Sequence, residues 1–379
     1  MPPASDSSSA RCARELSALL RDWQQELLVT GASSKVRRLV ASLRGTRLTV
    51  AVCAVTAALS LVDAPRGDGS LHDNPVRVLS ALVSCVPAQM FFLRRVPVVQ
   101  RVLQDLMDAA SILEPAFYWE RQDELLRTAR RGRLVGRVCA SYAVASALVI
   151  LSVLLPDDGE SRVVLGLRGA PLGVGVVGVV AVKAAVTLSC VSCLAAFYTC
   201  LTVLLVMYTA SASLLGALGD RFGADSGPEQ LALLCRAHGR LVLAVCRADA
   251  VFRDLYPLYL STILLLPLLT TTEVVVTGNI DLIALSTMPV ILCVFVPLCF
   301  AGQRLQDTSV MVCWLVYGGR WVSEGVLARR LRVHAMAMAN KGCGVSVHGL
   351  GPLDRPACAR ALSNWFRFLQ MLLSLRAAA

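Results

Sequence analysis

Six polar residues recur along one face of the last apolar segment of the chain, Pro356 to Leu375. At about 100° per residue, a helix over this segment gathers them into one stripe, opposite a face of leucine and aromatic side chains. The stripe comprises Arg360, Ser363, Asn364, Arg367, Gln370 and Ser374. Lipid would leave these groups without hydrogen-bonding partners, so the stripe predicts contact with water, a partner helix or a pore.

Side chains that could carry out a reaction do not cluster in the sequence. It has no Ser/His/Asp arrangement, no paired carboxylates within an apolar segment and no phosphate-binding loop. Glu273 is the only acid well inside an apolar segment, where it is either functional or hydrated near the membrane surface. The four histidines lack metal-ligand spacing. We therefore predict no enzymatic activity, no cofactor and no metal.

The composition indicates a protein with several membrane spans. Its 379 residues are 56% hydrophobic, with a mean hydropathy of +0.63, which is too apolar for a soluble domain. Seven apolar segments have lengths that suit a hydrocarbon core about 30 Å thick. They are Leu48–Val62, Val76–Leu93, Val138–Leu155, Ala184–Met207, Leu258–Val276, Leu282–Ala301 and Pro356–Leu375. The fold class predicted is an all-α membrane protein with seven transmembrane helices.

The basic residues predict the orientation of these helices. The net charge is +11, but the charges are spread among the connections rather than gathered in one domain, so we predict no nucleic-acid binding. Of the 37 lysines and arginines, 30 lie in the N-terminal tail and every second connection. The positive-inside rule then places the N-terminus in the cytosol and the C-terminus outside. The predicted parts are a cytosolic segment 1–47, helices one to six 48–301, an inner segment 302–355 and the last helix with its tail 356–379.

The inner connections are long and have the periodicity of helices. Apolar side chains recur at helical spacing in the fourth connection, so the fourth and fifth spans are expected to continue as helices into the cytosol. These residues are Leu231, Leu234, Cys235, His238, Leu241, Val242 and Val245. His238 is expected to be a structural hydrogen-bonding group. The apolar faces need a partner, which predicts a packed intracellular bundle or an oligomer contact.

The C-terminal third of the sequence carries an ordered set of motifs. From Cys299 it reads C-F-A-G, then a serine, a tyrosine and a tryptophan downstream, then G-L-G-P-L-D-R and W-F-R-F-L-Q-M-L. This pattern resembles the C-terminal third of insect odorant receptors. The matching residues are Cys299, Gly302, Ser309, Tyr317 and Trp321, with His238, Leu241 and Phe252 upstream.

The resemblance implies a tetrameric, ligand-gated, nonselective cation channel in the plasma membrane of sensory neurons, formed with a common co-receptor. It also implies that the cytosolic ends of spans four to six and the first part of the seventh span form an anchor bundle. His238, Gly302, Ser309, Tyr317 and Trp321 would belong to this bundle. The second part of the last helix would line the pore. By the same resemblance, the gate falls on Met371 and Leu375, with Ser374 between them and Gln370 and Arg367 nearby. Arg367 departs from the family, which usually has a small hydroxyl residue there.

The resemblance also implies a ligand pocket among the outer halves of spans two, three, four and six. The residues there are small and aliphatic, which indicates a small apolar volatile held by dispersion and desolvation. They are Ser80, Val83, Ala147, Leu151, Ser189, Val191, Leu285 and Met288.

Three alternatives have different sequence requirements. A gustatory receptor of the same superfamily would end in T-Y, five apolar residues and Q-F, which the end of this chain does not match. A G-protein-coupled receptor would need the opposite orientation. A transporter is disfavoured because the two halves show no matching interrupted spans.

Overall fold

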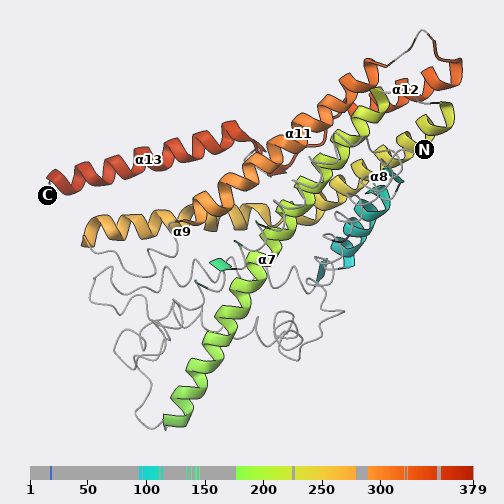
Figure 1. The fold of residues 1–379 in the computed structure, drawn as a ribbon. Helices are drawn as coiled ribbons and strands as arrows, with labels where there is room; N and C mark the ends of the chain where they lie inside the picture. Colours follow the sequence, from blue (N-terminus) through green and yellow to red (C-terminus); the bar gives the residue numbers. More distant parts are fainter. Residues whose placement is uncertain are drawn as a thin grey trace, which may run out of the picture.

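The structure, a computed structural model, is almost entirely helical in the part of the chain that it describes (Figure 1). That part comprises residues 18, 94–95, 97–110, 112–113, 134, 138, 141–142, 145, 176–223, 227–278, 289–319, 321, 323–347 and 351–378. The predicted first and second spans and nearly all of the third lie outside it. The all-α expectation is confirmed for the described ranges, apart from one short pair of strands.

The longest element is α7, Val176–Gly223, a single helix of 48 residues. At 1.5 Å per residue it is about 72 Å long, more than twice the thickness of a hydrocarbon core. It contains the predicted fourth span and runs on without interruption, as the sequence indicated. From Val203 onward its side chains are mostly buried, and α11 and α8 pack against it.

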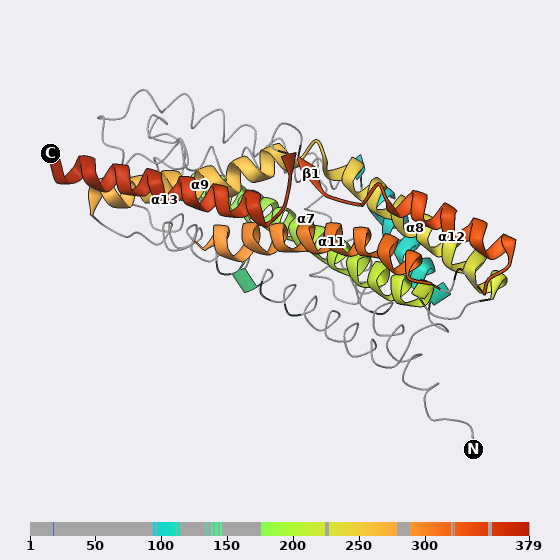
Figure 2. The ribbon, with the colours of Figure 1, turned by 90° about the horizontal axis from the view of Figure 1, so that it is seen from above.

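The next two helices, α8 (Pro228–Phe252) and α9 (Tyr256–Thr277), are separated by only three residues. Each has a proline in its first turn, where the missing N–H costs no hydrogen bond. α9 contains the predicted fifth span and ends at Gly278, whose φ of 75° permits the left-handed conformation that closes the helix. The two helices point in different directions from their junction (Figure 2).

The sixth predicted span is described from Pro289 onward. It enters a π-helical turn, η3 (Ile291–Phe295), and continues as α11 (Val296–Tyr317). Pro297 lies two residues after the end of the π turn, and this turn adapts the helix to a residue without an N–H. α11 crosses the predicted boundary at residues 301 and 302 without a break and leads to α12 (Val326–Ala339), which packs beside α8 and α11.

After α12 the chain turns back toward the last helix. Strands β1 (Ser346–Val347) and β2 (Gly351–Pro352) pair antiparallel, with Ser346 opposite Pro352. The chain then enters α13 (Arg355–Ala378), which contains the predicted seventh span. α13 packs against α9 and α11, and it runs alongside α9 in both views of Figures 1 and 2.

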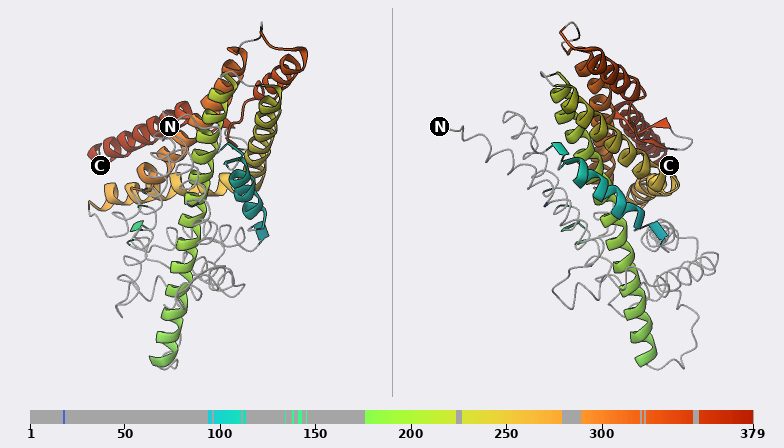
Figure 3. Two further views of the ribbon diagram at one scale, coloured as in Figure 1. Left: turned by 45° about the vertical axis from the view of Figure 1, so that its right-hand side comes forward. Right: turned by 90° about the vertical axis from the view of Figure 1, so that its right-hand side faces the viewer.

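Residues 94, 95 and 97–110 are also helical, and we call them the linker helix. Its buried residues, Val99, Val102, Leu103, Leu106, Ala109 and Ala110, recur at helical spacing and join the main core. It lies beside α8 and crosses α7 (Figure 3).

In the described part of the chain, Val203–Gly223 is the one helical stretch long and apolar enough to cross a membrane, and most of it is buried in the bundle. A shorter apolar stretch, Ile263–Val275, lies in α9.

Candidate functional site

The polar stripe on α13 is exposed along its whole length. Arg360, Ser363, Asn364, Arg367, Gln370 and Ser374 are all exposed. Met371 and Leu375 lie on the same side, with 49% and 60% of their surface exposed. Ser374 donates its hydroxyl hydrogen to the carbonyl oxygen of Met371 at 2.8 Å. No other helix in the described part of the chain covers this face, so it is available to water or to another subunit.

The opposite face of α13 packs against the protein. Cys358, Ala361, Leu362 and Trp365 contact the main core, and Phe368, Leu369 and Leu372 are half-buried. Phe366 and Leu373, which the helical pattern grouped with this apolar face, are instead exposed. The packed face is therefore narrower than the pattern predicted, because α13 rests on only two described helices, α9 and α11.

Four contacts fix the beginning of α13. The Asp354 carboxylate accepts a hydrogen bond from the Ala357 N–H at 2.7 Å, which caps the helix. The N–H of Arg355 donates to Gln303 Oε1 of α11 at 3.3 Å, and the Arg355 guanidinium lies 5.0 Å from the centre of the Phe300 ring. The thiols of Cys358 and Cys299 also lie close enough to interact, and both residues are buried. The first turn of α13 is thus held on α11.

Two of the motif residues, Gly302 and Ser309, let the segment that leads into α13 pack against α11. Gly302 faces the Leu353 carbonyl so closely that a Cβ there would lie 2.3 Å from the oxygen. Ser309 accepts a hydrogen bond from the Cys343 N–H at 2.8 Å and donates to the Gln306 carbonyl at 2.8 Å. Both contacts bring the segment after α12 back onto α11.

Two further motif residues, Tyr317 and Trp321, lie together at the far end of α11. The Trp321 indole N–H donates to the Tyr317 carbonyl at 2.7 Å, and the two ring centres are 6.3 Å apart. The tryptophan satisfies a carbonyl at the end of the helix, where no further turn follows. The Tyr317 side chain itself is exposed.

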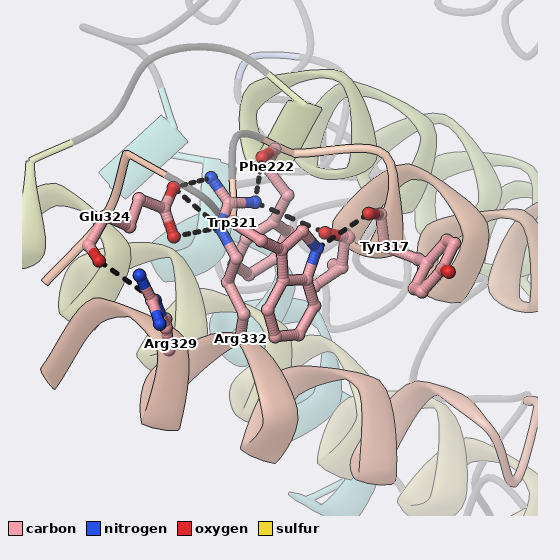
Figure 4. Close-up of polar contacts among 7 residues, drawn as sticks. Phe222, Tyr317, Trp321, Glu324, Arg329 and Arg332 are labelled. Atoms are coloured by element: carbon pink, nitrogen blue, oxygen red, sulfur yellow. Dashed lines mark hydrogen bonds and ion pairs between the residues drawn. The ribbon is translucent and has the colours of Figure 1, made fainter. Parts of the chain in front are cut away.

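Arg332 of α12 joins three helices at this end of the molecule (Figure 4). Its side chain is fully buried, at 0% exposure, and it pairs with Glu324 through Nε at 2.6 and 2.8 Å and through Nη2. Its Nη1 donates to the carbonyl oxygens of Phe222, at 2.6 Å, and Val316, at 3.3 Å. These carbonyls lie in the last turns of α7 and α11, where helices carry partial negative charge. Gly319 leaves the space that the guanidinium needs.

His238 lies on the inner face of α8, as predicted, and is 1% exposed. Burial, together with the smaller repulsion from the nearby His334, lowers its pKa from 6.5 to about 4. The expected hydrogen-bonding role does not extend to Nδ1, which has no partner in the described part of the chain. Of the seven recurring residues on this helix, all but the half-buried Val242 are buried.

The predicted ligand pocket lies almost entirely outside the described residues. Ser80, Val83, Ala147, Leu151, Leu285 and Met288 are outside them, and Ser189 and Val191 are described only as helical residues of α7. Glu273 is described and is buried, at the end of α9 nearer Gly278. In the described ranges, no three His, Cys, Asp or Glu side chains come together as metal ligands would.

The sequence patterns did not reveal the polar contacts of the linker helix. Arg95 pairs with Asp254 at 2.6 Å, Arg247 pairs with Asp105, and Arg240 lies 3.9 Å from Asp108. Partners more than 130 residues apart in the chain leave no local signal.

Comparisons with known proteins point to one fold. No family model matches the sequence, and no curated protein matches it. The solved structure of the insect olfactory receptor OR5 from Machilis hrabei superposes with a TM-score of 0.71 at 12% identity. The match covers 96% of this chain and 97% of that receptor. The structure of the same receptor in complex with eugenol gives a TM-score of 0.68 at 12% identity over the same shares.

The chain therefore has the all-α membrane fold of an insect olfactory receptor, as the C-terminal motifs suggested. Both matching structures are of the same olfactory receptor.

Proposed function

We propose that this protein is an odorant receptor subunit, in which binding of a small apolar volatile opens a nonselective cation pore. The observation that carries the proposal is α13: one face packs on α9 and α11, while a continuous polar face is left open. Together with the fold of an olfactory receptor, this supports a helix that contributes one wall of a shared water-filled path.

The pore would be formed by the α13 helices of four subunits, including a common co-receptor. Met371 and Leu375 are one helical turn apart and exposed, so they supply an apolar constriction when four copies converge. Gln370 and Ser374 supply polar groups beside them. Arg367 lies one turn before Met371, on the cytosolic side of the proposed gate.

The ligand site is proposed among Ser80, Val83, Ala147, Leu151, Ser189, Val191, Leu285 and Met288. The related receptor OR5 has been solved with eugenol, which makes this compound a rational first ligand to test. A ligand opens the channel only to the extent that it binds the open arrangement more tightly than the closed one.

The bundle of α7, α8, α11 and α12 is proposed as the cytosolic anchor of the assembly. With the N-terminus in the cytosol, the chain divides into 1–47, 48–301, 302–355 and 356–379 as set out above. His238, Gly302, Ser309, Tyr317 and Trp321 would serve assembly, and their contacts within this bundle and with the segment after α12 support that role. The plasma membrane of sensory neurons is the proposed location.

Current recording tests the function directly. The protein is co-expressed with the co-receptor, and currents are recorded over an odour panel that includes eugenol, with the co-receptor alone as the control. Ligand-evoked cation current that requires both subunits is expected. Silence toward every ligand, despite surface expression, would refute the proposal.

A label on the C-terminus tests the orientation. The epitope should be reached by antibody in intact cells, because α13 is proposed to run outward. Labelling only after permeabilisation would reverse the topology and favour a G-protein-coupled receptor.

A further inference from the structure

Charged pairs join the linker helix to α8, and their order along one helix is the reverse of their order along the other. Arg95 pairs with Asp254, Asp105 with Arg247, and Asp108 lies near Arg240. As the number rises on the linker helix, it falls on α8, so the two helices run antiparallel. Arg95 is the member of this set that reaches beyond α8, to the junction with α9.

The junction between α8 and α9 is a kink without a glycine. Arg253 and Leu255 both have right-handed helical backbone angles. At these two positions the backbone is therefore close to that of one continuous helix. The Leu255 N–H donates to the Phe252 carbonyl at 2.9 Å and not to the carbonyl of Val251, four residues earlier. The last carbonyls of α8 therefore need partners from elsewhere.

Arg95 supplies these partners. Its Nη1 donates to the carbonyl oxygens of Ala250, at 3.1 Å, and Val251, at 2.7 Å, while Nη2 donates to the Asp254 carboxylate at 2.6 Å. The cation also lies at the partially negative end of α8. A guanidinium can hold all three oxygens because its N–H groups are fixed in one plane. The angle at the kink is thus set by a side chain of another helix.

Arg95 stands between the two parts of the molecule that gating must connect. In the chain it follows the predicted second span, Val76–Leu93, directly after Arg94. Beyond the kink, α9 runs alongside α13 (Figure 2). A displacement of the linker helix would change the kink, and a change at the kink would move α9 against α13.

We propose that Arg95 is the positioning residue that couples movement of the linker helix to the α8–α9 kink and so to the pore helix. This coupling rests on the proposed function as a ligand-gated channel. It assigns to Arg95 a role in transmission and none in contacting ligand or ions.

The Arg95→Ala variant should respond weakly although it is made and assembled. At equal surface density, its maximal current at saturating ligand should fall by about fivefold or more, the size of a typical coupling between sites. The maximal current of Arg95→Lys should lie between those of the wild type and Arg95→Ala. An ammonium group keeps the charge opposite Asp254 but cannot bond both carbonyls in the fork geometry.

Arg247→Ala is the matched control. It breaks the pair with Asp105, which joins the same two helices about two turns away from the kink. Its maximal current should stay near that of the wild type. Equal losses in Arg95→Ala and Arg247→Ala would overturn the coupling, because they would mean that Arg95 only holds the helices together.

Amide hydrogen exchange of the full-length protein tests the kink without reference to current. Residues 250–256 should exchange faster in Arg95→Ala than in the wild type or in Arg247→Ala. Unchanged exchange would overturn the assignment.

A wild type that never gives ligand-evoked current would refute the proposed function and the coupling with it. Normal wild-type current with undiminished Arg95→Ala current would overturn the coupling alone.

Discussion

The carbonyl oxygen of Leu353 occupies the space that a side chain at position 302 would need. A Cβ on Gly302 would lie 2.3 Å from this oxygen, closer than such atoms approach in proteins. The absence of a side chain on α11 is therefore what lets the segment before α13 rest on it. The Cys299–Cys358 contact, one turn earlier on α11, continues the same seam.

Replacing Gly302 with alanine should separate α13 from α11. The obstructing atom is backbone and cannot rotate away, so we expect a loss of about 1–3 kcal/mol of stability and a reduced fraction of assembled protein. Thermal unfolding and size-exclusion chromatography in detergent measure both. Gly239→Ala is the control, since nothing lies within 4 Å of its Cβ and alanine should stabilise α8 by about 0.5–1 kcal/mol. Equal effects of the two changes would contradict this account.

Removing the buried Arg332 should destabilise the far end of the bundle. Arg332→Leu leaves Glu324 and the Phe222 carbonyl without their partner, at a cost of about 3–5 kcal/mol. Arg329 is three residues away, is exposed and donates to the Glu324 carbonyl rather than to its carboxylate, so Arg329→Ala should change stability by about 0.5 kcal/mol or less. Unfolding midpoints of the purified variants distinguish the two. A mild effect of Arg332→Leu would mean that the network contributes little.

His238 should make the bundle sensitive to acid. Its pKa is lowered to about 4 in the folded protein, so the unfolded chain binds the proton more readily. The stability that depends on neutral His238 is therefore present above pH 6.5 and declines as the pH falls toward 4, by up to about 3 kcal/mol. His238→Phe should flatten this part of the stability profile between pH 6.5 and 4. A profile with the same slope in both proteins would assign the acid sensitivity to other groups.

Arg367 should limit cation flow. It lies on the open face of α13 and has no ion pair within the described residues, so its charge would repel permeating cations. Arg367→Ser should raise single-channel conductance by about two- to fivefold at low ionic strength, and by less at high salt where charges are screened. Arg367→Lys keeps the charge and should resemble the wild type. Unchanged conductance in the serine variant would place position 367 away from the ion path.

The sequence predicted those helices whose buried and exposed faces are set by residues close together in the chain. The stripe from Arg360 to Ser374 marked α13 and its open face, since a helix keeps residues three and four apart on one side. The same rule indicated the buried face of α8 around His238. Ordered motifs from Cys299 to Trp321 indicated the fold, although their physical role became clear only from contacts such as those of Gly302 and Ser309.

Long-range polar contacts could not be predicted in this way. Arg332 lies in a basic helix where a charge normally faces water, yet it is buried because two helix ends and Glu324 converge on it. Arg95 bonds carbonyls more than 150 residues away, and backbone acceptors leave no trace in residue types. The narrower packed face of α13, with Phe366 and Leu373 exposed, depends on how many helices surround it, which periodicity does not report.

The unbroken course of α7 would make the protein sensitive to bilayer thickness. A helix that crosses the membrane at one end and is embedded in a packed bundle at the other cannot tilt in lipid without moving that bundle. A bilayer thinner than its apolar stretch forces such a tilt through hydrophobic mismatch. Over the roughly 36 Å of the inner half of α7, a tilt of about 10° displaces the bundle end by roughly 6 Å. Lipid composition would then change how the packed bundle is held.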